Sequence, residues 1–284
     1  MFTKNRWTAL GFALGLTILF AAALPAASRA QPQPAVRLYA MDCGHAALAD
    51  AGPLADNGAF KGVARELIIP CFLIRHPKGD LIWDTGVAEA LAGLPNGVNM
   101  AGGHITMPHS LAAQLAQLGL KPGDIGYLSL SHTHIDHSGN VGLFKNALWI
   151  VGARERDWVL KDPASAAHGP LLTARTKVLV GDDDYDVFGD GSVTIIQAPG
   201  HTPGHAVLLV RLTKAGPVLL TGDLWQLSES RRDRLVPTNN TDRAQTLASM
   251  DKVEAVIART HARVVREHVM EDFRALPAFP TPLD

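Results

Sequence analysis

Residues 131–140 read SHTHIDHSGN and place three histidines and one aspartate within six positions. These residues are His132, His134, Asp136 and His137. Neutral imidazole and carboxylate groups are typical ligands of zinc and similar transition metals. A single turn could aim all four side chains at one point. The stretch therefore predicts a metal site, although a chain with 12 histidines must contain some neighbouring ones by chance.

Further metal-capable side chains follow apolar runs that are typical of strands. IGYLSLS precedes His132, and VTIIQAPG precedes His201. PVLLTG precedes Asp223, and ARVVRE precedes His268. Strand ends share a rim in open α/β sheets, and ligand sites favour such rims. We therefore expect a pair of ions about 3.5–4 Å apart, as in hydrolytic two-metal sites. The predicted ligands are His132, His134 and His201 for the first ion, Asp136, His137 and His268 for the second, and Asp223 as a bridge.

Short aliphatic runs alternate with turn signals, and two longer stretches have helical periodicity. The predicted helices are residues 110–118 and 241–259, in which apolar side chains share one face. The predicted strands are residues 36–39, 67–74, 80–83, 125–131, 147–151, 177–179, 192–198, 206–211, 217–221 and 263–265. This order indicates an α/β or α+β fold with two β-rich halves. The Gly-rich stretch AGGHITMPHS is interpreted as a lid or as a solvated loop.

The first 30 residues have the features of a secretory signal. Lys4 and Arg6 precede a long uncharged run, and Ser28-Arg29-Ala30 resembles a cleavage site. We expect cleavage after Ala30, a mature domain of residues 31–284, and a periplasmic or secreted location. The alternative is an uncleaved anchor, because the run is long enough to span a bilayer. The sequence after residue 30 contains no second apolar run of that length, so no transmembrane segment is expected there.

The mature segment would carry 23 basic and 27 acidic residues, a net charge near −4. It has no basic block, and nothing in it predicts a nucleic-acid partner. Cys43 and Cys71 lack the spacing of a zinc-ligand pair. An exported protein could join them as a disulfide. Two buried free thiols fit equally well, because Cys71 lies in the apolar run ELIIPCFLIRH.

The motifs HTHIDH, PGHTPGH and TGD, followed by a histidine after the last strand, resemble the metallo-β-lactamase superfamily. The resemblance covers about residues 36–273 and implies an α/β fold, the four-layer αββα sandwich, with two Zn²⁺ ions. Other divalent transition metals would also suit such ligands. Asp84, in WDTG, resembles the aspartate that supports the metal loop, and is otherwise an ordinary turn residue. His205 is interpreted as structural, and Glu267 would face away from the site if it lay on a strand.

Several segments resemble the N-acyl-homoserine lactonase branch, among them RLYAMDCGHAAL and NNTDRAQTLASMDKVEAVIA. This resemblance implies a zinc-dependent, quorum-quenching hydrolase that opens the lactone ring through a metal-bridging hydroxide. Asp136 and Asp223 are the expected catalytic residues, one of them relaying a proton to the leaving alkoxide. The expected substrate-binding residues are Trp225 and Gln226, the latter where a well-known lactonase has a tyrosine. Apolar residues of 87–107 would receive the acyl chain.

Two alternatives remain open. The same site could belong to another hydrolase of this fold, such as a broad lactonase, an arylesterase or a weak β-lactamase, since one fold hosts many reactions. A non-catalytic metal-binding protein is the second, although it would have no need of an open two-metal centre. A Ser-His-Asp hydrolase is disfavoured because the sequence lacks G-x-S-x-G. Lactonases of this type are often dimers, so we expect a homodimer, although no motif in the sequence indicates an interface.

Overall fold

The structure, a computed structural model, describes residues 1–3, 35–100, 102–161 and 168–284. Its larger compact unit is Pro34–Asp284. The proposed signal segment and its cleavage point after Ala30 fall on residues 4–34, outside the described part. None of the helices that the structure describes is both long enough and apolar enough to cross a membrane.

The larger sheet has the strand order β4-β5-β1-β2-β3-β6-β7-β8. Its strands are β1 (Arg37–Leu48), β2 (Arg65–Arg75), β3 (Leu81–Trp83), β4 (Val98–Met100), β5 (Gly103–Thr106), β6 (Tyr127–Ser129), β7 (Leu148–Gly152) and β8 (Thr176–Leu179). β1 and β2 form a long antiparallel pair, whereas β3, β6, β7 and β8 run parallel to one another. Because Trp83 pairs with Ser129, the turns after β3 and β6 leave the sheet at the same edge.

The smaller sheet has the order β13-β12-β11-β10-β9. Its strands are β9 (Tyr185–Asp186), β10 (Val193–Gln197), β11 (Ala206–Leu212), β12 (Gly216–Leu220) and β13 (Arg263–Val265). β12 and β13 are parallel, with Leu220 opposite Val265. The segments that follow these two strands therefore also start from a common edge.

Alternation of side chains along the strands divides the apolar residues between two faces. In β2, Phe72 and Ile74 belong to the cluster between the sheets, where they pack with Leu208 of β11. Cys71 and Leu73, on the opposite face of β2, belong to a second cluster. The larger sheet is thus buried on both faces of β2. This burial explains why the sequence of β2 is almost continuously apolar instead of alternating with polar residues.

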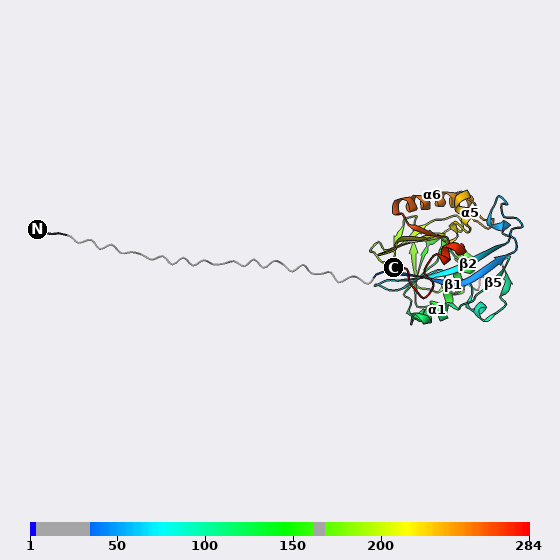
Figure 1. The fold of residues 1–284 in the computed structure, drawn as a ribbon, viewed down its shortest axis with the longest axis horizontal. Helices are drawn as coiled ribbons and strands as arrows, with labels where there is room; N and C mark the ends of the chain where they lie inside the picture. Colours follow the sequence, from blue (N-terminus) through cyan, green and yellow to red (C-terminus); the bar gives the residue numbers. More distant parts are fainter. Residues whose placement is uncertain (4–34, 101, 162–167) are drawn as a thin grey trace. The chain divides into compact units, whose positions relative to one another are not determined.

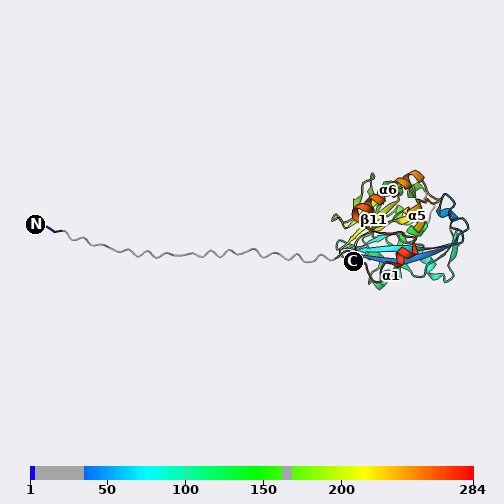
Figure 2. The ribbon, with the colours of Figure 1, turned by 45° about the horizontal axis from the view of Figure 1, so that its top comes forward.

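The outer clusters are completed by two amphipathic helices, α1 (Leu111–Gln117) and α6 (Arg243–Thr260). Leu111 and Leu115 of α1 pack on the larger sheet, and Met250 and Val253 of α6 pack on the smaller one. Figures 1 and 2 show α1 and α6 on opposite sides of the strands. The four-layer αββα sandwich is confirmed.

Helix caps explain where these helices begin. Ser110 accepts a hydrogen bond from the backbone N–H of Ala113, and Asp242 accepts one from Gln245, as N-cap residues do. The remaining α-helices are α2 (Ile135–Ser138), α3 (Ala153–Lys161), α4 (Gly169–Leu172), α5 (Ser228–Asp233) and α7 (Met270–Arg274). Short 3-10 helices are η1 (Gly52–Leu54), η2 (Glu89–Gly93), η3 (Pro122–Asp124), η4 (Val141–Leu143) and η5 (Gly222–Leu224).

Each predicted strand has a counterpart, but β1 extends nine residues beyond the predicted end at residue 39. The prediction missed β4, β5 and β9. Residues 103–106, expected to be a lid or a solvated loop, form β5 and pair with β1 through Ala46 and Ile105. The solvated-loop alternative is wrong for these residues, because β5 lies between β4 and β1. Its partner β1 lies about 60 residues away in the sequence, where local pattern gives no signal.

Cys43 and Cys71 form a disulfide that joins β1 to β2. Of the two alternatives for these cysteines, the structure has the bonded one. The disulfide lies close against the turn after β3. A Cβ added to Gly86 in this turn would lie only 2.3 Å from the Cβ of Cys43. Gly86 has a φ of 67°, a conformation that glycine adopts without strain.

Reduction of this disulfide should lower the free energy of unfolding by about 3.6 kcal/mol, since it closes a loop of 28 residues in the unfolded chain. Urea titration with and without reductant measures the change. The double variant Cys43→Ala/Cys71→Ala is the control and should not respond to reductant. An unchanged wild-type midpoint under reducing conditions, with free thiols verified, would contradict the prediction.

Candidate metal centre

Strand ends from both sheets supply the predicted ligands. His132 lies three residues after β6 and His201 four residues after β10. Asp223 lies three residues after β12, and His268 lies three residues after β13. Because β3 and β6, and likewise β12 and β13, end at common edges, these loops converge from segments far apart in the sequence. The structure thus brings together the predicted ligands from all four segments.

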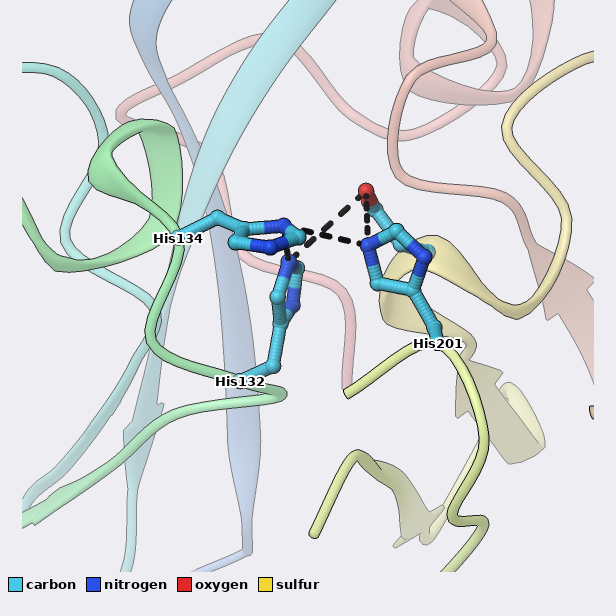
Figure 3. A group of neighbouring side chains, drawn as sticks. His132, His134 and His201 are labelled. Carbon is cyan, nitrogen blue, oxygen red and sulfur yellow. Dashed lines mark hydrogen bonds and ion pairs between the residues drawn. The ribbon is translucent and has the colours of Figure 1, made fainter. Parts of the chain in front are cut away.

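The first group consists of His132, His134, His201 and Asp223. Figure 3 shows the rings of the three histidines turned toward one another, with His132 and His134 on one loop and His201 on another. His134 Nδ1 lies 2.8 Å from His132 Nε2 and 3.1 Å from His201 Nε2. Asp223 Oδ2 lies 3.1 Å from His201 Nε2 and 3.7 Å from His132 Nε2.

The second group consists of Asp136, His137 and His268, with the other oxygen of Asp223 facing it. The Nε2 atoms of His137 and His268 lie 3.3 Å apart. Asp223 Oδ1 lies 3.1 Å from the first and 2.8 Å from the second. Asp136 Oδ2 is 3.8 Å and 3.6 Å from the same two nitrogens. Asp223 therefore presents one oxygen to each group, as the predicted bridge requires.

These distances fit metal binding. Ligand atoms 2.0–2.1 Å from one tetrahedral zinc ion would lie about 3.3 Å from each other. The separations within the two groups range from 2.8 to 3.8 Å. Asp223 Oδ1 is buried and faces the Nε2 atoms of His268 and His137 at 2.8 and 3.1 Å. A buried anionic oxygen of this kind requires a positive partner, and the donor set fits two divalent cations.

The two groups differ in their proton affinity. Burial lowers the pKa of His132 well below its usual value, and the neighbouring histidines lower it further. Burial and the proximity of His201 lower the pKa of His134 to about 4. His132 and His134 therefore present neutral imidazoles at neutral pH, which is the form that binds a metal ion.

Burial alone would lower the pKa of His137, but the carboxylates of Asp84 and Asp223 outweigh it and raise the pKa well above its usual value. Burial would also lower the pKa of His268, but the carboxylate of Asp223 outweighs it and raises this pKa. Burial would raise the pKa of Asp223, yet His268 and the other histidines hold it well below its usual range. The second group thus keeps protons that a metal ion must displace.

Outer hydrogen bonds orient the rings. Asp84 Oδ2 lies 2.8 Å from His137 Nδ1 and accepts from the hydroxyl of Ser131, and Asp84 Oδ1 accepts from the backbone N–H of Ser131. Asp84 has a φ of 55°, which is uncommon outside glycine and places its carboxylate under the metal loop. His268 Nδ1 donates to the carbonyl of Ile68 at 2.8 Å. Such partners fix both the tautomer and the direction of a ligand.

Two further residues hold the loop that carries Asp223. His205 donates from Nδ1 to the carbonyl of Ala198 and accepts the backbone N–H of Asp223 at Nε2. Burial lowers the pKa of His205 to about 3, so the ring stays neutral in this structural role. Glu267 accepts from Trp83 Nε1 and from the backbone N–H of Gly222.

The expectation that Glu267 faces away from the site is wrong. β13 ends at Val265, so Glu267 lies beyond the strand and its alternation does not apply. The side chain is fully buried, and burial together with the Asp84 carboxylate raises its pKa well above the usual value. Sequence reasoning missed this residue because its acidic partner, Asp84, is almost two hundred positions away.

A cavity of about 510 Å³ opens onto both groups. Its polar wall includes Asp136, Asp223, Gln226 and His268. Its apolar wall consists of side chains from β1, β2 and β5 and the segments beside them, among them Leu48, Leu54, Leu67, Ile69, Val87 and Ile105. The centre is therefore accessible, and one side of it can accommodate an aliphatic chain.

Trp225, predicted to contact substrate, is not among the cavity-lining residues. It is 1% exposed and packs in the cluster beneath α6, with the guanidinium of Arg231 5.3 Å from its ring centroid. The chain is extended at Trp225, with φ −141° and ψ 99°, which turns successive side chains to opposite sides. Gln226 consequently faces the cavity and Trp225 faces the core.

Comparison with known proteins agrees with this geometry. The model of the metallo-beta-lactamase superfamily matches residues 64–268. The N-acyl homoserine lactonase AttM of Azorhizobium caulinodans is 36% identical over 231 residues, 77% of this chain and 87% of that protein. The N-acyl homoserine lactonase AiiA of Bacillus thuringiensis subsp. kurstaki is 29% identical and covers 77% of this chain and 88% of its own length.

A solved structure of an N-acyl homoserine lactone hydrolase, with its product N-hexanoyl-L-homoserine bound at the catalytic metal center, is also similar. It is 26% identical, has a TM-score of 0.75, and the match covers 87% of this chain and 98% of that one. This chain belongs to the metallo-beta-lactamase superfamily. With its two groups of metal-capable side chains, it is an enzyme of the metal-dependent hydrolase type.

We expect the metal ion of the second group to be lost first as the pH falls from 8 to 6. The raised pKa values of His137 and His268 mean that protons compete there as the pH falls, whereas His134, with a pKa of about 4, remains neutral. Metal content after dialysis at each pH, measured by mass spectrometry, checks this order.

Two single-site variants provide the comparison. His268→Ala should keep the first ion throughout this pH range, and His201→Ala should lose the second ion within it. Release from both variants at the same pH would show that the two groups do not differ in proton affinity.

Proposed function

We propose that this enzyme opens the lactone ring of N-acyl-homoserine lactones, a quorum-quenching reaction, with two zinc ions at the candidate centre. The observation that carries the proposal is the cavity: one wall offers the two ligand groups, and the facing wall is apolar. An N-acyl-homoserine lactone has the same two parts, a polar ring and an aliphatic tail. The lactonases that share up to 36% identity with this chain support the same substrate class.

Zinc is favoured by the donor set, since imidazole nitrogen with carboxylate oxygen suits this ion. Bound zinc would supply an activated water and would polarise the lactone carbonyl. The chain's own contribution is to hold Asp223 between the two groups and to leave one side open to the cavity. Export to the periplasm or the medium and a homodimer remain predictions.

Asp136 is the residue that we assign to proton transfer. Its side chain is 32% exposed and lines the cavity, whereas Asp223 is 3% exposed and has each oxygen turned to one ligand group. Asp136 turns Oδ2 toward His137 and His268, which leaves its other oxygen available. Cleavage of the ester C–O bond produces an alkoxide, and Asp136 is placed to take up the proton of the attacking water and pass it to that oxygen.

Gln226 is the residue that we assign to recognition of the amide. Its Nε2 donates to Asp223 Oδ2 at 2.6 Å, an orientation that the acceptor-only carboxylate imposes. Its Oε1 is buried and has no donor among the described residues. Because Gln226 lines the cavity beside the ligands, a small rotation of its amide that exposes Oε1 would let this oxygen accept a hydrogen bond from the N–H next to the lactone ring.

The test of the proposal follows acid release from short- and long-chain acyl-homoserine lactones, a chromogenic β-lactam and a phenyl ester. We expect rapid opening of the lactones, with activity lost in His134→Ala. Absence of lactone opening by protein that carries two zinc ions would refute the lactonase assignment. Preference for the phenyl ester or the β-lactam would favour another hydrolase of this fold.

Asp136→Asn should reduce the turnover number at least about 100-fold, because an amide cannot deliver the proton. Steady-state kinetics on an acyl-homoserine lactone, with zinc content measured on the same sample, checks the effect. Asp157→Asn, a surface aspartate on α3, is the matched control. Near-normal turnover at full metal occupancy would remove Asp136 from this role.

Gln226→Leu should lower kcat/KM about fivefold for an acyl-homoserine lactone, since it removes a hydrogen bond to the amide worth about 1 kcal/mol. A γ-lactone with an alkyl chain of the same length but no amide should lose less, because for this substrate the substitution removes only the hydrogen bond from Nε2 to Asp223 Oδ2. Equal losses on both substrates would mean that Gln226 does not read the amide.

A further inference from the structure

Glu155, on α3, is a charged residue in an unusual environment. It is 2% exposed, and no lysine or arginine pairs with it in the described part of the chain. An isolated buried carboxylate is costly unless hydrogen bonds replace its water. Neither the predicted ligand set nor the proposed reaction uses this residue, so its burial requires a separate explanation.

Four hydrogen bonds satisfy the carboxylate, and each oxygen serves a different loop. Oε1 accepts from the backbone N–H of Thr133 at 2.8 Å and from its hydroxyl at 2.7 Å. Oε2 accepts from the hydroxyl of Thr202 at 2.7 Å and from the backbone N–H of Gly204 at 3.0 Å. Thr133 separates His132 from His134, and Thr202 directly follows His201.

The loop containing Gly204 also packs tightly on the start of α3. A Cβ on Gly204 would lie 2.3 Å from the backbone nitrogen of Glu155 and 2.5 Å from its Cβ. Contacts this short would force the backbone to move. The loop of His201 is therefore held against the helix both by packing and by the hydrogen bonds of Glu155.

One ligand of the first group, His201, needs such support more than the histidines of the second group. His137 and His268 each have an outer partner on the ring, Asp84 and the carbonyl of Ile68. His201 Nδ1 is buried and has no hydrogen-bond partner among the residues that the structure describes. The direction of its ring consequently depends on the position of its loop.

We propose that Glu155 is a positioning residue that sets the first metal site, by joining the loop of His132 and His134 to the loop of His201 through one carboxylate. It does not touch the ion or the substrate. Its effect is to fix the separation between ligands that approach from two different strand ends. This inference rests on the proposed metal centre but is independent of the proposed substrate.

The test measures zinc affinity by competition with a chromogenic chelator, in full-length variants that retain one site each. In the His268→Ala background, which keeps the first site, Glu155→Gln should weaken zinc binding 10- to 100-fold, the usual loss when an outer partner of a ligand is removed. In the His201→Ala background, which keeps the second site, the same substitution should change the affinity less than about threefold.

Thr202 offers a matched pair of milder changes, should Glu155→Gln fail to fold. Thr202→Ser keeps the hydroxyl and should bind zinc at the first site as wild type does. Thr202→Val removes the hydroxyl at nearly constant volume and should weaken the first site severalfold. Melting temperatures of the metal-free variants separate this effect from general destabilisation.

Unchanged first-site affinity in Glu155→Gln, or in Thr202→Val if the former does not fold, would overturn the proposal. Equal losses at both sites, accompanied by a lower melting temperature of the metal-free protein, would also overturn it by showing a merely structural role. Wild-type protein that binds no zinc would refute the metal centre, and this inference with it. Failure of lactone opening alone would refute only the proposed substrate.

Discussion

The carboxylate of Asp223 is the group on which the centre depends. Its two oxygens lie within 2.8–3.7 Å of imidazole nitrogens from four histidines, and the side chain is almost completely buried. An anion in such a place is stable only beside positive charge. Protons on the second group or bound metal ions can supply that charge, which couples metal binding to the protonation of the same histidines.

The packed apolar sandwich stabilises this arrangement by fixing the loops that carry the ligands. Glu267 joins the ends of two sheets, because it accepts from Trp83 at the end of β3 and from Gly222 after β12. Gly222 has a φ of 50°, and a Cβ there would lie 2.6 Å from the Cβ of Ser131. The metal loop and the Asp223 turn therefore approach one another more closely than any larger residue would allow.

Residues adjacent to a motif were predictable, and residues that act across the fold were not. The HTHIDH motif and the apolar runs before His201, Asp223 and His268 located the candidate ligands, because strand ends in α/β folds share edges. Glu155 and Glu267 gave no local signal, since their partners lie tens to almost two hundred residues away. Trp225 was misassigned because sequence proximity to Asp223 does not specify which side of the chain a side chain takes. The strands β4 and β5 were missed because the pairing of β5 with β1, and of β4 with β5, depends on tertiary contact rather than on intrinsic propensity.

The most direct test of the account is the anomalous scattering of zinc-loaded crystals at the zinc absorption edge. The account predicts two peaks about 3.5–4 Å apart, with one oxygen of Asp223 bound to each. The peak beside His132, His134 and His201 should be distinct from the peak beside Asp136, His137 and His268. A single peak, or two peaks of which Asp223 contacts only one, would contradict the bridged two-metal centre from which the proposed function follows.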